Sequence, residues 1–370
     1  MKLAILGTRG IPARYGGFET FAEELAVRLA AKGVDVTVYC AAGDGAAPES
    51  YKGVRLEYIP SPHIGPFTTI LFDIRSLIDA RKGFDAVYML GYGASAFCFI
   101  PRLYGSDVWI NMDGMEWARA KWGVVARVYL KTMEAFAMRA PNRIIADAGG
   151  IKDFLEGRHR RVPPCDVIAY GARVVDTAPQ DAVLGEMRLK RGGYYLVVCR
   201  LEPENHLLEI IKGFNASGSV LPLVIVGNHN IDTHYVRELK AAGGQGVRFA
   251  GAVYDEAKLK ALRYYCKAYC HGHSVGGTNP SLLEALGCGN IVIAHDNPFN
   301  REVAGDAGLY FKGPEEIPGF MAAIEAMSVD ERNGISARAR LIIKERYDWD
   351  KIADMYLRLL NGLRPDCQRL

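Results

Sequence analysis

The sequence lacks several features that would assign it to a common class at once. Its formal net charge is only +3 over 370 residues, so the total charge gives no support to nucleic-acid binding. No apolar run approaches the ~20 residues that a membrane helix needs. The opening MKLAILG has a single lysine and an apolar run too short for a signal peptide. We therefore expect a cytoplasmic protein that meets any membrane from its surface.

The motifs of several enzyme classes are also missing. The first loop contains Gly7 and Gly10 but no G-x-G-x-x-G, and no acidic residue ends the second expected strand at Cys40, where a dinucleotide ribose would need one. Neither a Walker A motif nor a G-x-S-x-G elbow is present. The D-x-D string at residues 348–350 opens the last expected helix, away from any strand end. These absences argue against an oxidoreductase and against a metal-dependent transferase on a single sheet.

The cysteines give no indication of a disulfide framework or of a metal site. All eight are scattered and most lie in apolar runs, which is typical of buried thiols in a reducing compartment. Cys266, Cys270, His271 and His273 are close in sequence, but their spacing matches no zinc pattern. We expect no metal ion and no other cofactor.

What the sequence does contain is a repeated alternation of apolar strands and helices. Hydrophobic residues make up 49% of the chain, and its length is sufficient for two domain-sized cores. The alternation predicts an α/β protein with two doubly wound parallel-sheet (Rossmann-like) domains. The expected strands are residues 2–6, 34–40, 54–59, 85–90, 108–111 and 143–146 in the first half, and 194–199, 223–226, 247–249, 268–271 and 291–294 in the second.

The alternation loosens between residues 172 and 193, which marks a domain boundary. We predict a first domain over residues 1–171, a second over 172–347 and a C-terminal segment over 348–370. The amphipathic helix in that last segment has no strand after it to pair with, and it is a candidate to pack back on the first domain. Ligands of doubly wound sheets bind at the carboxyl ends of the strands, so we expect the two domains to face each other across a cleft.

The most informative loop lies in residues 271–289, HGHSVGGTNPSLLEALGCG. Gly276 and Gly277 allow the backbone to approach a ligand closely, and the Asn-Pro pair that follows is typical of a helix start. Amides from Gly276 to Ser281 could bind a diphosphate, and Glu284 could accept hydrogen bonds from sugar hydroxyls. An ordinary capped helix after a tight turn fits the same spacing equally well.

Three charged residues directly follow expected strands. Arg200 could bind a diphosphate as a planar donor, and a surface ion pair with a neighbouring glutamate is the alternative. Asp113 and Glu116, in NMDGMEW, could orient a sugar hydroxyl or accept its proton. Their spacing also suits a capping box at the start of the following helix.

Residues 117–143 form a basic segment with interleaved aromatic residues. It carries six basic side chains and one acidic side chain, a local excess of five positive charges. This pattern predicts contact with an anionic membrane surface, although a solvated helix face also produces such a run.

Four blocks of the sequence resemble GT-B glycosyltransferases of family GT4. The blocks are GTRGIPARYGGFET, NMDGMEWARAKW, RLEPEN and GHSVGGTNPSLLEAL, in this order across nearly the whole chain. More narrowly they are similar to the bacterial rhamnosyltransferase branch, which includes the streptococcal β-1,4-rhamnosyltransferases. The resemblance implies a retaining, metal-independent transfer from a nucleotide sugar on the second domain to an acceptor on the first. The implied donor is dTDP-β-L-rhamnose. The implied acceptor is a polyprenyl-diphosphate-linked saccharide at the inner face of the cytoplasmic membrane, in cell-wall, capsule or O-antigen polysaccharide synthesis.

The resemblance also assigns roles to individual residues. Arg200 takes the place of the diphosphate-binding arginine, and Asp113 falls about where many members have an active-site histidine. Two positions depart from the family pattern, because Asn205 replaces a lysine and Gly276 replaces the first of two glutamates. The implied catalytic residues are Asp113 and Arg200; the donor-binding residues are Gly16, Gly17, Arg200, Asn205, Gly276, Gly277, Thr278, Asn279 and Glu284; the acceptor-binding residues are Arg9, Arg14, Tyr15, Glu116 and Trp117.

Because of the two departures, other activities stay open. A UDP- or GDP-sugar could replace the rhamnosyl donor in the same reaction. A sugar-nucleotide epimerase of the same fold would need no acceptor, and a non-catalytic nucleotide-sugar-binding protein would show no turnover. A dinucleotide oxidoreductase would bind NAD.

Overall fold

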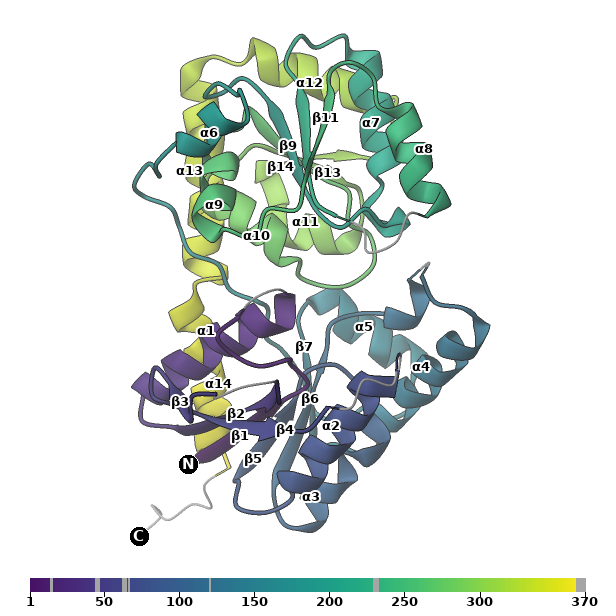
Figure 1. The fold of residues 1–370 in the computed structure, drawn as a ribbon, viewed down its shortest axis with the longest axis vertical. Helices are drawn as coiled ribbons and strands as arrows, with labels where there is room; N and C mark the ends of the chain where they lie inside the picture. The colour runs from purple at the N-terminus through teal and green to yellow at the C-terminus, as the bar shows by residue number, and fades with distance from the viewer. Residues whose placement is uncertain are drawn as a thin grey trace. The chain divides into compact units, whose positions relative to one another are not determined.

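The computed structural model describes residues 1–13, 16–43, 47–61, 65, 67–119, 121–228 and 233–363, and the chain forms two compact units (Figure 1). The first unit contains residues 1–117 and 122–170 together with the residues from Trp349 onward. The second unit contains Ala118–Lys121 and Gly171–Asp348. Within the described residues, no helix has the length and apolar character that crossing a membrane requires.

An eight-stranded sheet of order β3-β4-β2-β1-β5-β6-β7-β8 forms the centre of the first unit. Every pair is parallel except β3 with β4. The central strands are continuously apolar, as in β1, because helices cover both faces of such a sheet. The strands are β1 (Lys2–Leu6), β2 (Asp35–Ala41), β3 (Ser50–Tyr51), β4 (Val54–Ile59), β5 (Ala86–Met89), β6 (Asp107–Met112), β7 (Arg143–Ala146) and β8 (Cys165–Val167).

The last helix of the chain, α14 (Trp349–Asn361), packs within the first unit on α1 (Gly17–Ala31). The hydroxyl of its buried Tyr356 lies 2.8 Å from the hydroxyl of Tyr88 on β5. At the surface, Arg28 Nε lies 2.9 Å from Asp350 Oδ1. The other helices of this unit are α2 (Phe67–Asp79), η1 (Ser95–Phe97), α3 (Phe99–Leu103), η2 (Glu116–Ala118), α4 (Val124–Ala137) and α5 (Gly149–Arg158).

The second unit has a six-stranded sheet, entirely parallel, of order β11-β10-β9-β12-β13-β14. Its strands are β9 (Tyr195–Val198), β10 (Leu223–Val226), β11 (Val247–Gly251), β12 (Ala268–His271), β13 (Val292–His295) and β14 (Gly308–Phe311). Its helices are α6 (Ala182–Glu186), η3 (Pro203–Asn205), α7 (Leu207–Ser217), α8 (His234–Ala242), α9 (Glu256–Tyr265), α10 (Pro280–Gly287), α11 (Pro298–Ala304), η4 (Gly305–Ala307), α12 (Ile317–Ala326) and α13 (Val329–Arg346).

Successive side chains of β9 point to opposite faces of the second sheet, and apolar residues occupy both faces. Tyr195 and Val197 point to one face, into a core shared with Ile210 of α7. Leu196 points to the other face, into a core shared with Leu262 of α9. Because helices cover both faces, a ligand reaches this unit most readily at the loops beyond the strand ends.

The predicted fold class, two doubly wound parallel sheets, is confirmed. The sequence did not predict the edge strands β3, β8 and β14. No residue of β8 is fully buried, and only Phe311 is buried in β14, so neither strand carries a continuous apolar signal.

Candidate functional site in the second unit

The order of strands in the second unit reverses between β9 and β12. From β9 the chain continues outward to β10 and β11, and then returns to the other side of β9 to form β12, β13 and β14. Loops on the two sides of such a switch point run apart, which leaves room for a ligand at the carboxyl ends of the strands. Arg200 follows β9, and the Gly276-Gly277 loop follows β12. The two predicted donor-binding segments therefore lie at one switch point.

Asn205 connects these two segments. Its Nδ2 donates to the carbonyl oxygen of Arg200 at 2.7 Å, and its Oδ1 lies 2.8 Å from Nδ1 of His273. The residue is only 6% exposed. The sequence places Asn205 among the donor-binding residues, whereas the structure uses its amide for contacts within the protein.

The side chain of Arg200 is exposed at the end of β9. Within the described part of the chain, its guanidinium forms no ion pair with Glu202 or Glu204, which was the alternative to ligand binding. Its main chain is held by Asn205, so the guanidinium projects from a fixed backbone position. A cation placed in this way can bind an anion with little competition from the protein.

The loop before α10 has the predicted cap. Gly276 has a φ of 120°, in the region that favours glycine. Asn279 Oδ1 accepts a hydrogen bond from the Ser281 amide at 2.9 Å, so Asn279 is the N-cap of α10. The Ser281 amide is therefore already bonded within the protein. The amides of Gly276 and Gly277, which come earlier in the loop, are better candidates to bind an anion.

Glu284 is held in place by Arg263, a residue that the sequence analysis missed. Arg263 Nη2 lies 2.7 Å from Glu284 Oε2; the side chain of Arg263 is 6% exposed and that of Glu284 is 44% exposed. The same Nη2 lies 3.2 Å from Ser281 Oγ, which lies 2.6 Å from the hydroxyl of Tyr269. The buried network orients a carboxylate that still reaches solvent. Arg263 lies on a different helix, α9, so no spacing pattern could have indicated this pair.

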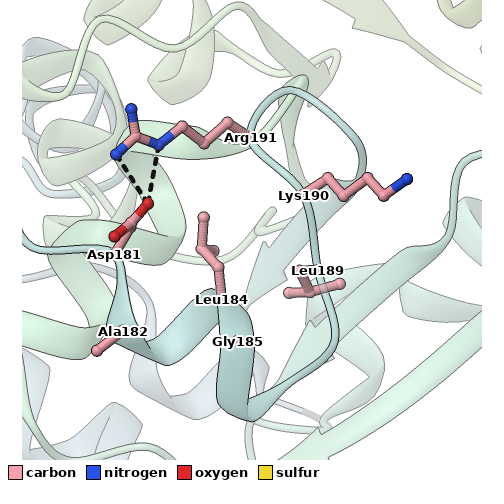
Figure 2. A pocket seen from close by; sticks show the side chains of 7 residues that line it. All are labelled: Asp181, Ala182, Leu184, Gly185, Leu189, Lys190 and Arg191. Carbon is pink, nitrogen blue, oxygen red and sulfur yellow. Dashed lines mark hydrogen bonds and ion pairs between the residues drawn. The ribbon is translucent and has the colours of Figure 1, made fainter.

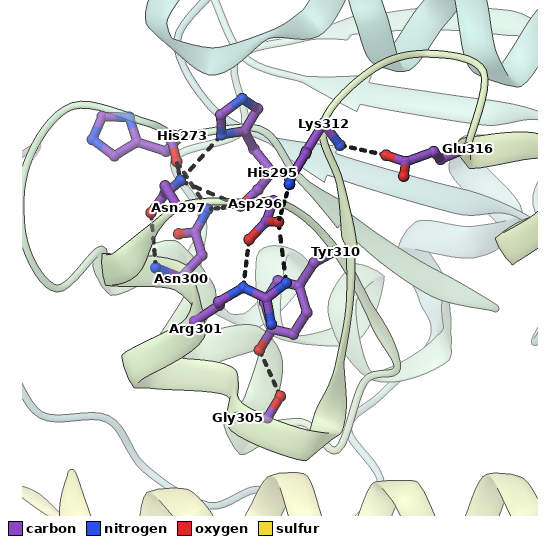
Figure 3. Close-up of polar contacts among 10 residues, drawn as sticks. All are labelled: His273, His295, Asp296, Asn297, Asn300, Arg301, Gly305, Tyr310, Lys312 and Glu316. Atoms are coloured by element: carbon purple, nitrogen blue, oxygen red, sulfur yellow. Dashed lines mark hydrogen bonds and ion pairs between the residues drawn. The ribbon is translucent and has the colours of Figure 1, made fainter.

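Histidine and asparagine side chains fix the backbone where β12 ends. Nδ2 of Asn297 and Nδ2 of Asn300 both donate to the carbonyl oxygen of His273, each at 3.0 Å (Figure 3). The rings of His206 and His295 stack with centroids 4.0 Å apart, and burial lowers the pKa of His295. Within the described residues, no group of three or more His, Cys, Asp or Glu side chains could hold a metal ion.

In the first unit, the loop after β1 is tied to neighbouring helices. The Arg9 amide donates to Glu19 Oε1 at 3.0 Å, and Arg9 Nη2 donates to Thr69 Oγ1 at 2.8 Å. Gly16 has a φ of 122° and is the N-cap of α1, which begins at Gly17. Predicted residues Arg14 and Tyr15 lie outside the described residues.

The predicted residues after β6 lie in and just before the short helix η2. Asp113 is half-buried directly after the strand. Glu116 begins η2, and its Oε1 accepts a hydrogen bond from Trp122 Nε1 at 3.0 Å. Trp117 Nε1 donates to buried Glu134 at 2.6 Å, and Lys131 Nζ lies 4.6 Å from the centre of a Trp117 ring. Glu116 and Trp117 thus make contacts within the protein.

A surface hollow of the second unit contains none of these residues. It lies beside α6, near the amino end of β9, with Leu184 and Leu189 in its lining (Figure 2). Arg191 Nη2 pairs with Asp181 Oδ2 at 2.7 Å on its rim. The hollow lies near the amino end of β9, whereas the switch point lies at the carboxyl ends of the strands.

The chain matches two known protein families, one in each half. Residues 188–354 match the family described as "Glycosyl transferases group 1". This match covers most of the second unit. Residues 1–173 match a family described as a domain of unknown function, DUF1972.

Individual relatives are distant. An uncharacterized glycosyltransferase of Methanocaldococcus jannaschii is 25% identical over 249 residues, which cover 64% of this chain and 62% of the relative. Phosphatidyl-myo-inositol mannosyltransferase of Mycobacterium tuberculosis is 29% identical over 152 residues, 37% of each chain. The chain thus spans less than two thirds of the length of these relatives.

Solved structures of other proteins share the fold of this chain. The crystal structure of Anabaena HepE in complex with UDP-glucose matches with a TM-score of 0.77 at 16% identity, covering 98% of this chain and 100% of that chain. At this identity the likeness concerns the fold alone. The fold is therefore GT-B, as the sequence predicted.

Proposed function

We propose that the protein is a glycosyltransferase that moves a sugar from a nucleoside diphosphate to an acceptor hydroxyl. The observation that carries the proposal is the group at the switch point of the second unit: the exposed guanidinium of Arg200, the loop at Gly276 and Gly277, and the carboxylate of Glu284 held by Arg263. A cation and amides suit a diphosphate, and an oriented carboxylate suits ribose hydroxyls. Thr278 and Asn279 complete the donor loop, and Gly16 and Gly17 are its counterpart in the first unit.

The proposed chemistry needs no metal ion. The bond between the anomeric carbon and the diphosphate oxygen breaks, and the acceptor oxygen bonds to the same carbon. Arg200 and the loop amides stabilise the negative charge that grows on the departing diphosphate. The acceptor proton passes to that diphosphate oxygen on the same face of the sugar, so the anomeric configuration is retained. Asp113 positions the sugar or the acceptor.

For the donor we propose dTDP-β-L-rhamnose, on the basis of the sequence blocks shared with the rhamnosyltransferase branch. A UDP- or GDP-sugar is the alternative, because one relative is named a mannosyltransferase and the HepE structure contains UDP-glucose. A thermal-shift panel of dTDP, UDP, GDP and ADP with their sugar conjugates distinguishes them, since a ligand at 100 times its Kd stabilises the native state by about 2.7 kcal/mol. A selective response to dTDP and its sugar conjugate supports rhamnose as the transferred sugar. A selective response to another nucleotide and its conjugate would identify that nucleotide sugar as the donor instead. No response to any nucleotide or conjugate refutes the proposed function.

For the acceptor we propose a polyprenyl-diphosphate-linked saccharide, met at the inner face of the cytoplasmic membrane through residues 117–143. Helix α4 supports this proposal, because Val124 and Val125 at its start are 79% and 85% exposed. The exposed side chains of Arg127 and Lys131 lie on the same helix. Apolar side chains among cations are typical of a helix that lies on anionic lipid.

Vesicle flotation tests the membrane contact. The double variant Val124→Asp and Val125→Asp should lose binding to vesicles that contain anionic lipid, because it removes apolar area and adds negative charge. Val220→Asp is the matched control, since Val220 is 94% exposed but belongs to the second unit. Equal binding of the double variant and the control would refute docking through α4.

Incubation of the protein with the sugar nucleotide alone separates a transferase from an epimerase. We expect slow hydrolysis or no reaction, whereas interconversion to a second sugar nucleotide would indicate an epimerase. Turnover with a synthetic lipid-linked acceptor would exclude a protein that only binds nucleotide sugars.

A further inference from the structure

His273 lies two residues beyond the end of β12 and is held at both its backbone and its ring. The amides of Asn297 and Asn300 bond its carbonyl oxygen, and its ring points away from them (Figure 3). On the other side, Asn205 Oδ1 lies 2.8 Å from the ring nitrogen Nδ1. A ring fixed in this way loses little conformational entropy when a ligand binds to it.

The contacts of Asn205 decide which ring nitrogen of His273 carries the proton. The atom of Asn205 next to the Arg200 carbonyl must be the donor Nδ2, because a carbonyl oxygen only accepts. The oxygen Oδ1 therefore faces His273, and Nδ1 must donate to it. Burial lowers the pKa of His273, so the ring is neutral at neutral pH. The second nitrogen, Nε2, consequently carries a lone pair and acts as a hydrogen-bond acceptor.

A lone pair on Nε2 selects the kind of group that can bind there. In the described part of the chain, no side chain is hydrogen-bonded to Nε2 of His273. An ionised phosphate oxygen offers no proton to Nε2, whereas a hydroxyl does. The ring therefore suits a hydroxyl of the donor rather than its diphosphate.

The order of groups along the loop indicates which hydroxyl this is. Gly276 and Gly277, the proposed diphosphate site, lie between His273 and Glu284. If Glu284 holds the ribose on one side of the diphosphate, His273 lies on the side of the sugar. We propose that His273 Nε2 accepts a hydrogen bond from a hydroxyl of the transferred sugar, an assignment that rests on the proposed function and adds a residue that determines sugar recognition.

Calorimetric titration with dTDP and with dTDP-β-L-rhamnose tests the proposal. His273→Phe keeps a flat ring without nitrogen and His273→Leu removes the ring; both should bind the sugar nucleotide about three- to tenfold more weakly, the loss of one hydrogen bond. Both should bind dTDP as the wild type does. His273→Gln offers an amide oxygen near the position of Nε2 and should recover part of the affinity. His234→Leu, at an exposed histidine on α8, is the matched control.

Different results would refute the role of His273 and the proposed transferase function. Wild-type affinity for the sugar nucleotide in His273→Phe or His273→Leu would overturn the role of His273 while the transferase proposal stands. An equal loss of affinity for dTDP and for its sugar conjugate would also overturn it, because the contact would then lie on the nucleotide or on the loop itself. A wild-type chain that binds neither dTDP-β-L-rhamnose nor any other sugar nucleotide of the panel would overturn both proposals.

Discussion

Replacing Arg263 by methionine tests how the second unit orients Glu284. The change keeps most of the side-chain volume and removes two contacts of Nη2, one to Glu284 Oε2 at 2.7 Å and one to Ser281 Oγ at 3.2 Å. Removing one partner of a fully buried ion pair costs about 3 to 5 kcal/mol. Water can solvate the carboxylate of Glu284 in the variant, because that side chain is 44% exposed. We therefore expect a smaller loss, about 1 to 3 kcal/mol, which lowers the Tm by roughly 2 to 12 °C for a domain of this size.

A double-mutant cycle separates the pair from other effects of the substitution. Urea unfolding of Arg263→Met, Glu284→Gln and the double variant should give an interaction energy of about 1 to 2 kcal/mol, because the second change removes little once the first is made. Affinity for the nucleoside diphosphate should fall in both single variants and no further in the double variant. Lys260→Met, which removes an exposed cation from the same helix, is the control.

Two results would refute this reasoning. Stability losses that add within about 0.5 kcal/mol would show that the two side chains act independently. A folded Arg263→Met variant with wild-type nucleotide affinity would show that Glu284 needs no support from Arg263, or that it does not contact the ligand.

Three further predictions concern the reaction and the fold. Arg200→Ala should lower kcat/KM more than tenfold, because one charge-assisted contact of ~1.5 to 3 kcal/mol is lost as the diphosphate departs; unchanged turnover would remove that role. Turnover should be the same with and without EDTA, and a loss that added Mg²⁺ reverses would contradict the metal-free scheme. Tyr356→Phe should lower the free energy of unfolding by about 1 kcal/mol in urea titration, because it deletes the buried bond to Tyr88. An unchanged free energy would mean that Asn111, which donates to Tyr88 at 3.2 Å, is a sufficient partner.

Local pattern in the sequence determined the fold class and the helix start at the donor loop. Central strands such as β1 and β12 were predicted at their observed bounds, because strands buried on both faces are continuously apolar. The cap at Asn279 was predicted because capping depends on residues a few positions apart. The edge strand β8 was missed because it has no fully buried residue.

Only the tertiary structure decided how the candidate site is held together. Asn205 and His273 are 68 residues apart in the sequence, and Arg263 and Glu284 lie on different helices. Contacts of this kind depend on which strands become neighbours in the sheet, and no spacing along the chain records that choice. The sequence by itself therefore indicated which loops are candidates to bind a ligand. The order of β9 and β12 decided which side chains in those loops face each other, and with that the proton position on His273.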